Sequence, residues 1–138
     1  MSKVQEISVA LRFYGDELDP EAISTRLGAL PSRSAVKGQR LPSASGRERV
    51  AKTSYWHLQS DAVAPDEEFE DHVRRLFDRL TADEEIWRDL GGRFTGDLFV
   101  GLFLTDTNEG LVISRETLSA ISARGLEINL DIYGPSDN

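Results

Sequence analysis

The residues best suited to chemistry are gathered in one basic stretch of the chain. Between Arg26 and Lys52, seven Lys and Arg residues are opposed by a single glutamate, so this stretch carries a net charge of +6 and the remainder −14. Its serines, glycines and lysines are residue types that hold phosphate groups, but their spacing fits neither G-x-x-x-x-G-K-[ST] nor G-x-G-x-x-G. The stretch also follows an expected helix, whereas phosphate loops join a strand to a helix. The pattern favours a solvated loop over a phosphate site, and its candidates for binding an anion or a partner are Arg33, Lys37, Arg40, Arg47 and Arg49.

Two histidines and the absence of cysteine limit the catalytic options. His72 lies one position before the apolar stripe of an amphipathic segment, where a solvated helix residue is expected. His57 lies on an expected strand, on the face opposite Trp56. The sequence contains no G-x-S-x-G elbow, no H-x-x-x-H or H-E-x-x-H metal motif and no acidic calcium loop. It therefore predicts no catalytic residue, no metal and no cofactor, and favours a protein that is not an enzyme.

A second candidate site arises where polar residues alternate with apolar ones along the expected strands. If the first and last strands pair, Arg12 and Tyr14 approach Asp131 and Tyr133, and Arg12 forms a cross-strand pair with Asp131. His57 from the middle strand would complete a face of charges and aromatic rings, which are residue types favoured at interfaces. A binding face and an ordinary solvated sheet surface are equally compatible with this pattern.

Charge and hydropathy restrict the partners. A net charge of −8 disfavours nucleic acid, because most of the surface would repel its phosphates. Base stacking also needs aromatic residues among basic ones, and the basic stretch is followed only at its end by Tyr55, expected to be exposed, and Trp56, expected in the core. No window approaches the roughly 20 apolar residues of a membrane span. With no cysteine, the chain suits a reducing compartment, so we expect a cytoplasmic protein that binds no membrane.

The elements that position these residues are predicted from apolar periodicity. Alternation predicts strands at residues 4–15, 53–60, 95–106, 111–114 and 126–134. A spacing of three and four predicts helices at residues 18–30, 65–80, 82–92 and 115–125, the third of them only a turn or two long. Residues 31–52 are expected to form one long basic loop with at most a short strand, and residues 135–138 a frayed tail. The apolar residues expected to point inward near the C-terminus are Leu118, Ile121, Leu126, Ile128, Leu130 and Ile132.

This order of elements predicts a single α+β domain over residues 1–138. We expect a mainly antiparallel sheet of about five strands with two to three helices packed on one face. The order strand, helix, strand, helix, strand, strand, helix, strand is similar to that of ferredoxin-like sandwiches.

The sequence also resembles a family of small bacterial proteins, the domain of unknown function DUF4279. The resemblance rests on Phe13 and Gly15, on "LDPEAISTRLG", "LPS", a following "KG", "YWHLQS" and "FEDHVRRLFDRL", and on the closing "GLVISRETLSAISARGLEINLDIY". It covers nearly the whole chain and implies one α+β domain. The family has no established activity, so the resemblance implies no catalytic residues.

Two functions remain compatible with the sequence. The lack of a catalytic set and the segregation of charge favour a small binding module that recognises a protein partner, or a second copy of itself, through the basic loop and the polar sheet face. The alternative is a protein or enzyme for an anionic small molecule, in which Arg33, Lys37 and Arg40 hold the anion while His57 or Asp131 handles protons.

Overall fold

The protein is built around a five-stranded mixed sheet. The computed structural model describes residues 2–4, 6–43, 45–61 and 66–136 of the 138 residues. The strand order is β3-β6-β2-β7-β9, in which β7 and β9 run parallel and the other neighbours are antiparallel. The strands are β3 (Arg33–Ala35), β6 (Tyr55–Gln59), β2 (Glu6–Tyr14), β7 (Thr95–Phe103) and β9 (Glu127–Tyr133). The predicted α+β domain with a mainly antiparallel sheet is confirmed.

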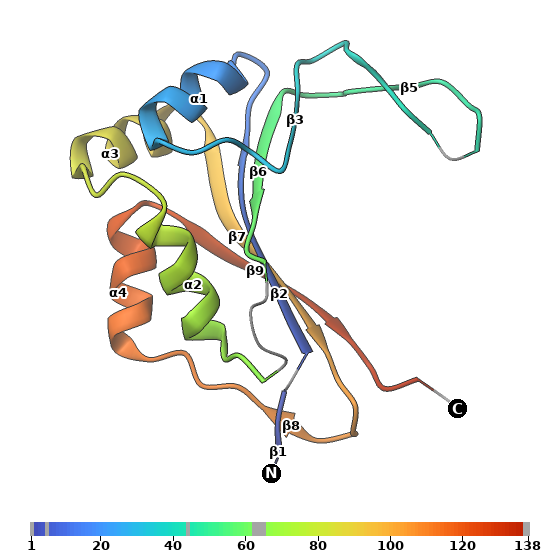
Figure 1. Ribbon diagram of the computed structural model, residues 1–138, viewed down its shortest axis with the longest axis vertical. Coiled ribbons are helices and arrows are strands. Elements are labelled where there is room, and N and C mark those ends of the chain that lie inside the picture. Colours follow the sequence, from blue (N-terminus) through green and yellow to red (C-terminus); the bar gives the residue numbers. More distant parts are fainter. Residues whose placement is uncertain (1, 5, 44, 62–65, 137–138) are drawn as a thin grey trace.

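The helices gather on one face of the sheet and leave the other face open (Figure 1). They are α1 (Pro20–Leu27), α2 (Phe69–Asp78), α3 (Glu84–Arg93) and α4 (Arg115–Ala123). Side-chain caps fix three of their starts, because Asp19, Asp83 and Ser114 each accept a backbone N–H from the first turn. Helix α3 has ten residues and is longer than the turn or two expected. It continues through Gly91 and Gly92, the glycine pair that was expected to end it.

The core lies between the helices and every second residue of the central strands. In β2, Val9, Leu11 and Phe13 are buried while the residues between them are partly exposed, which is the predicted alternation. The apolar stripe of α2 is buried as expected, and its members are Phe69, Val73, Leu76 and Phe77. The predicted core residue Trp56 is also buried, and its Nε1 donates to Ser24 Oγ at 2.9 Å.

Residues 31–52 form more regular structure than the expected loop. Besides β3, two short strands, β4 (Arg40–Leu41) and β5 (Arg49–Val50), pair antiparallel. We call residues 36–43 and 45–52 the arm, which projects from the end of β3 away from the helices (Figure 1). Backbone hydrogen bonds of 2.9 Å join Gly38 to Ala51 and Ala51 to Gln39 at its base. The segment expected to be a long loop with at most one short strand contains three short strands, because backbone pairing across its base organises it.

The C-terminal part differs most from expectation. Residues 111–114 form no strand, and instead β8 (Glu109–Gly110) pairs in parallel with β1 (Ser2–Lys3). Leu130 and Ile132 were expected inside but are 51% and 57% exposed, and Leu118 is 46% exposed. The reason for the first two is that the C-terminal half of β9 runs beyond the helical layer (Figure 1). Residues 135–136 of the expected tail belong to no helix or strand, and residues 137–138 lie outside the described part.

Candidate functional site

The open face of the sheet carries a continuous row of polar side chains. Lateral pairing places Arg33, His57, Arg12, Asp97 and Glu127 side by side, one from each strand from β3 to β9. The row has its cationic residues towards β3 and its anionic residues towards β9. Because strand residues alternate between faces, these side chains all project away from the helices. We call this set the polar row.

At the centre of the row, Arg12 and Asp97 form a bidentate ion pair. Arg12 Nε and Nη2 donate to the two carboxylate oxygens of Asp97 at 2.8 and 2.7 Å, and Asn129 Nδ2 donates to the same carboxylate at 2.5 Å. The Asp97 side chain is 4% exposed and that of Arg12 is 20% exposed. The guanidinium also lies 4.1 Å from the ring centre of Phe99, an attractive cation–π geometry. Hydrogen bonding to Asp97 raises the pKa of Arg12, so this group is a fixed positive charge.

Towards β3, His57 is held neutral between two arginines. Burial, followed by the charges of Arg33 and Arg12, lowers its pKa to about 4. Arg33 Nη2 lies 3.2 Å from His57 Nδ1, and since a guanidinium only donates, Nδ1 accepts and the ring proton sits on Nε2. That Nε2 is buried and has no hydrogen-bond partner among the described residues. The rings of Tyr14 and Tyr55 flank the imidazole, with centroids 5.3 and 4.7 Å away.

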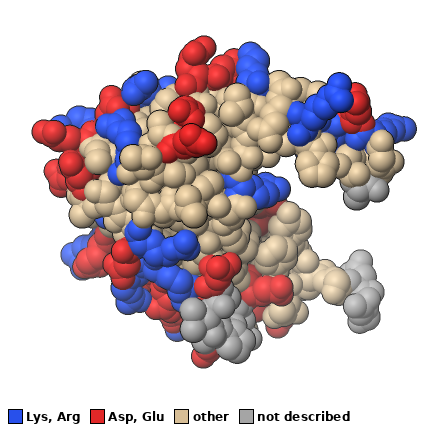
Figure 2. All heavy atoms as spheres, turned by 45° about the horizontal axis from the view of Figure 1, so that its top comes forward, with Lys and Arg blue, Asp and Glu red and all other residues tan. Residues whose placement is uncertain are grey.

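The arm stands over this end of the row and makes a cleft. The cleft has a volume of about 800 Å³. The open sheet face contributes Tyr14, Arg33, Tyr55 and His57, and the arm and its base contribute Leu41, Glu48, Arg49, Val50, Ala51, Lys52 and Thr53. Figure 2 shows a hollow between the arm, with its Lys and Arg side chains, and the body of the protein. Within the described part of the chain, the side chains of Arg49 and Lys52 form no hydrogen bond or ion pair, so their charges are available in the cleft.

The model of one protein family matches residues 5–135, nearly the whole chain. That family is described as a domain of unknown function, DUF4279. The chain belongs to the DUF4279 family. No curated protein and no solved structure matches this chain.

The remaining predicted site residues of this DUF4279 protein lie outside the cleft. Lys37 Nζ bonds Asp16 at 2.9 Å, and Arg40 pairs with Glu48 at 3.4 Å within the arm, so both charges have partners. Arg47 is exposed near the end of the arm, beyond the residues that line the cleft.

The expected pairing of the first and last strands is wrong. Strand β7 lies between β2 and β9, so Arg12 pairs with Asp97 and not with Asp131. Asp131 instead accepts a hydrogen bond of 2.5 Å from Tyr133, and both remain on β9, remote from the cleft. The buried strand at residues 95–103 carries one carboxylate amid apolar residues, and that isolated charge is the signal in the sequence that could have revealed the partner of Arg12.

The expectation of a solvated His72 is also wrong, because the residue is 2% exposed. Its Nδ1 lies 3.1 Å from Ser60 Oγ. Arg75 donates to the same oxygen at 3.1 Å and pairs with Glu67 at 2.5 Å. Serine, histidine and a carboxylate are hydrolytic residue types, but Ser60 is only 4% exposed, so no substrate reaches it. The network ties the end of β6 to α2 and has a structural role.

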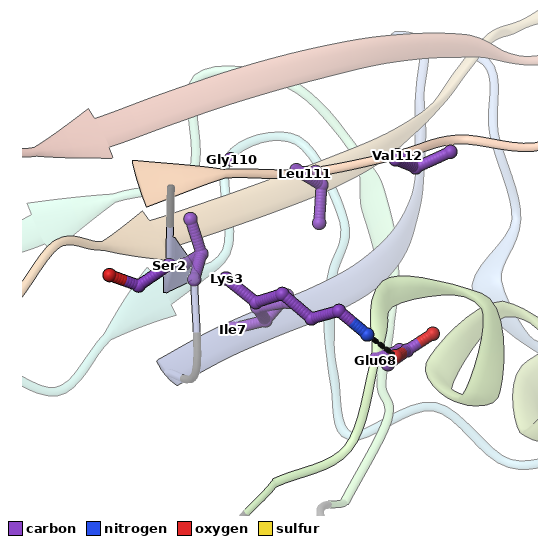
Figure 3. A pocket seen from close by; sticks show the side chains of 8 residues that line it. Ser2, Lys3, Ile7, Glu68, Gly110, Leu111 and Val112 are labelled. Atoms are coloured by element: carbon purple, nitrogen blue, oxygen red, sulfur yellow. Dashed lines mark hydrogen bonds and ion pairs between the residues drawn. The ribbon is translucent and has the colours of Figure 1, made fainter. Parts of the chain in front are cut away.

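A second cavity lies at the start of β2, beside β1 and β8 (Figure 3). Its volume is about 290 Å³, and it is lined by Ser2, Lys3, Val4, Ile7, Glu68, Gly110, Leu111 and Val112. Figure 3 shows Lys3 reaching from β1 to Glu68 at the start of α2, where the two charges meet at 2.7 Å. This ion pair satisfies the charges of the lining, so the cavity offers mainly apolar contacts.

Among residues 2–4, 6–43, 45–61 and 66–136, no group of three or more His, Cys, Asp or Glu side chains is placed to hold a metal ion. None of the helices in those ranges is long and apolar enough to cross a membrane.

Proposed function

We propose that this protein is a binding module that recognises an acidic segment of a partner protein in the cleft between the arm and the open sheet face. The observation that carries the proposal is that Arg33, Arg49 and Lys52 line one cleft together with the aromatic rings of Tyr14 and Tyr55. Carboxylates form charge-assisted hydrogen bonds with arginine, and tyrosine is favoured at interfaces because its ring gives contact area at low entropic cost.

The charge distribution favours an acidic partner. The chain carries −8 overall, yet Arg49 and Lys52 are unpaired on the arm among the described residues. Such a local positive surface attracts a negative segment while the acidic body repels it elsewhere, which orients the approach. The hollow is open to solvent along its side (Figure 2). That shape suits an extended chain better than a small molecule, because small-molecule pockets enclose most of their ligand.

The electrostatics of His57 favour binding over proton transfer. A general base works best when its pKa lies near the working pH, whereas the pKa of His57 is lowered to about 4 by burial and the neighbouring arginines. At neutral pH the imidazole is uncharged and serves as a rigid, aromatic part of the cleft floor.

The proposal is tested by titrating the protein into a fluorescently labelled polyglutamate peptide and following anisotropy. The variant Arg33→Gln/Arg49→Gln/Lys52→Gln removes the cations of the cleft. The control Arg79→Gln/Arg88→Gln/Arg115→Gln changes the net charge equally at exposed positions on the helical side. Each of the three cations should form an exposed ion pair with a glutamate of the peptide, worth about 0.5–1 kcal/mol. Losing all three predicts a loss of affinity of about 10- to 100-fold for the cleft variant. Equal affinities for the two variants would sink the proposal.

A small anion is the second candidate, because two arginines flank His57 in the polar row. Thermal unfolding with inorganic phosphate, nucleotides, phosphosugars and carboxylates separates it from the first. A ligand present at about 100 times its Kd adds about 2.7 kcal/mol to the stability of the protein. A shift that disappears in the cleft variant, with no binding of the polyglutamate peptide, would favour this second function.

The proposal includes the cellular location of the protein. We place the protein in the bacterial cytoplasm, which is supported by the absence of cysteine from the chain.

A further inference from the structure

Among the described residues, the outer edge of β9, on the side that faces away from β7, has no partner strand. The opposite edge strand, β3, has three residues and carries Arg33, and short, charged edges resist unwanted pairing. Strand β9 has seven residues without lysine or proline, and its two charged residues, Glu127 and Asp131, lie on the open face of the sheet. One edge of the sheet is therefore blunted and the other is left open.

The open edge carries apolar side chains that the helices do not cover. Pairing of β7 with β9 places Ile128, Leu130 and Ile132 on the helical side. The last two are 51% and 57% exposed, whereas their neighbours on β7 are buried. An edge strand with a row of half-exposed apolar residues is a template for pairing with another strand.

The free backbone groups of this edge belong to the same residues. Leu104 N donates to Tyr133 O at 2.9 Å, so the peptide groups of Tyr133 point towards β7. Because N–H and C=O directions alternate along a strand, Ile128, Leu130 and Ile132 direct theirs towards the open edge. Apolar side chains and unsatisfied backbone groups thus coincide at three positions.

We propose that this edge pairs antiparallel with β9 of a second copy, about a twofold axis at Leu130. In this register Leu130 faces its own counterpart and Ile128 faces Ile132 of the other copy. All three outward-facing residues then exchange backbone hydrogen bonds as hydrogen-bonded pairs. A shift by two residues in either direction leaves one of them unpaired. The twofold pairing is self-complementary, as the interface of a symmetric dimer must be.

The charges on the open face select the same register. With Leu130 on the axis, Asn129 faces Asp131 of the other copy, and Glu127 faces Tyr133. Shifting the pairing one way brings Glu127 opposite Asp131, and shifting it the other way brings Asp131 opposite Asp131. Like charges directly opposite destabilise a sheet, so backbone pairing and electrostatics favour the same arrangement.

Pairing of one short edge buries less surface than the roughly 1,600 Å² of a standard stable interface. We therefore expect a reversible dimer that depends on protein concentration. This interface is separate from the cleft, and its test is independent of the function proposed for the cleft.

Single-cysteine variants test the register, because the chain has no cysteine of its own. In a hydrogen-bonded antiparallel pair, opposing Cα atoms lie about 5.5 Å apart, within the range of a disulfide. Leu130→Cys should form a covalent dimer on mild oxidation. Ile128→Cys and Ile132→Cys alone should not, because identical residues are then about 14 Å apart along the strands. Mixed together, these two variants should cross-link. Equal cross-linking by all three single variants, or none by Leu130→Cys, would overturn the proposal.

A second pair of variants tests the interface without cysteine. Tyr133→Lys and Tyr133→Glu lose the same ring, but only the lysine gains an attractive partner in Glu127 of the other copy. Sedimentation equilibrium should give a tighter dimer for Tyr133→Lys and a weaker one for Tyr133→Glu. The same two charges introduced at exposed Ala82 control for net charge. A wild-type protein that remains monomeric at every concentration, or the same response at both positions, would refute the inference.

Discussion

Replacing Asp97 with alanine should destabilise the fold more than removing any other carboxylate of the open face. Asp97 is the counter-charge of Arg12 and the acceptor for Asn129. Removing one partner of a fully buried ion pair costs about 3–5 kcal/mol. Because the Arg12 side chain retains 20% exposure, water replaces part of the lost interaction, and we expect a loss of about 2–4 kcal/mol. For a chain of this length, about 3 kcal/mol corresponds to a fall in Tm of about 10 °C.

Urea unfolding monitored by tryptophan fluorescence measures this loss, since Trp56 and Trp87 are both buried. Asp131→Ala is the matched control, because its carboxylate accepts a hydrogen bond only from Tyr133 in the described part of the chain. It should change stability by no more than about 0.5 kcal/mol. A double-mutant cycle with Arg12→Ala should give a coupling energy within the range of about 0.5–3 kcal/mol seen for residues in contact, and near its upper end. Equal costs for the two carboxylates, or an additive cycle, would refute this account of the polar row.

Two further predictions concern packing and pH. Gly96→Ala should destabilise the protein by about 1–3 kcal/mol, because the added Cβ would lie 2.7 Å from the ring of Phe13. Gly92→Ala in α3 has open space around it and should stabilise the protein by about 0.5–1 kcal/mol. Thermal unfolding should therefore show Tm shifts of opposite sign, and shifts of the same sign would contradict the packing. The pKa values of His57 and His72 are both lowered in the folded protein, so protonation favours the unfolded chain. The free energy of unfolding should therefore fall as the pH drops below about 6.5. Urea titrations from pH 7.5 to 4.5 would test this, and His57→Gln/His72→Gln should show a shallower pH dependence.

Much of the fold can be predicted from the periodicity of apolar residues along the sequence. The alternation around Val9 and Leu11 fixes which face of β2 is buried, and the stripe of α2 identifies the helix that covers it. Both patterns are local, and burial of the apolar face decides them. The polar side chains of the open face, including Arg12 and His57, follow from the same alternation.

The strand order could not be derived in this way. Which strand lies next to β2 depends on the crossover through α4 and on long-range packing, and alternation does not record either. The sequence therefore favoured Asp131 as the partner of Arg12, although Asp97 holds that place. His72 illustrates a similar limit, because the stripe of a single helix does not reveal Ser60 and Arg75, which make the burial of His72 tolerable.

The arm shows how far composition alone can be taken. Its basic composition predicts a binding segment, but the backbone hydrogen bonds that organise it join Gly38 and Gln39 to Ala51, and these residues form no distinctive sequence pattern. Composition thus located the candidate site, while the structure decided that Arg33, Arg49 and Lys52 line the cleft and that Lys37 and Arg40 are already paired.

The position of the cleft at one end of the strand order has a consequence for assembly. Neighbouring strands are about 4.8 Å apart, so β3 and β9 are separated by about 19 Å, roughly twice the Debye length at physiological ionic strength. Charges at the cleft and at the β9 edge are therefore screened from each other. Two chains joined through β9 would form one continuous ten-stranded sheet with a cleft at each end, about 43 Å apart. Such a bivalent arrangement would hold a target bearing two acidic segments with an avidity that neither cleft provides alone.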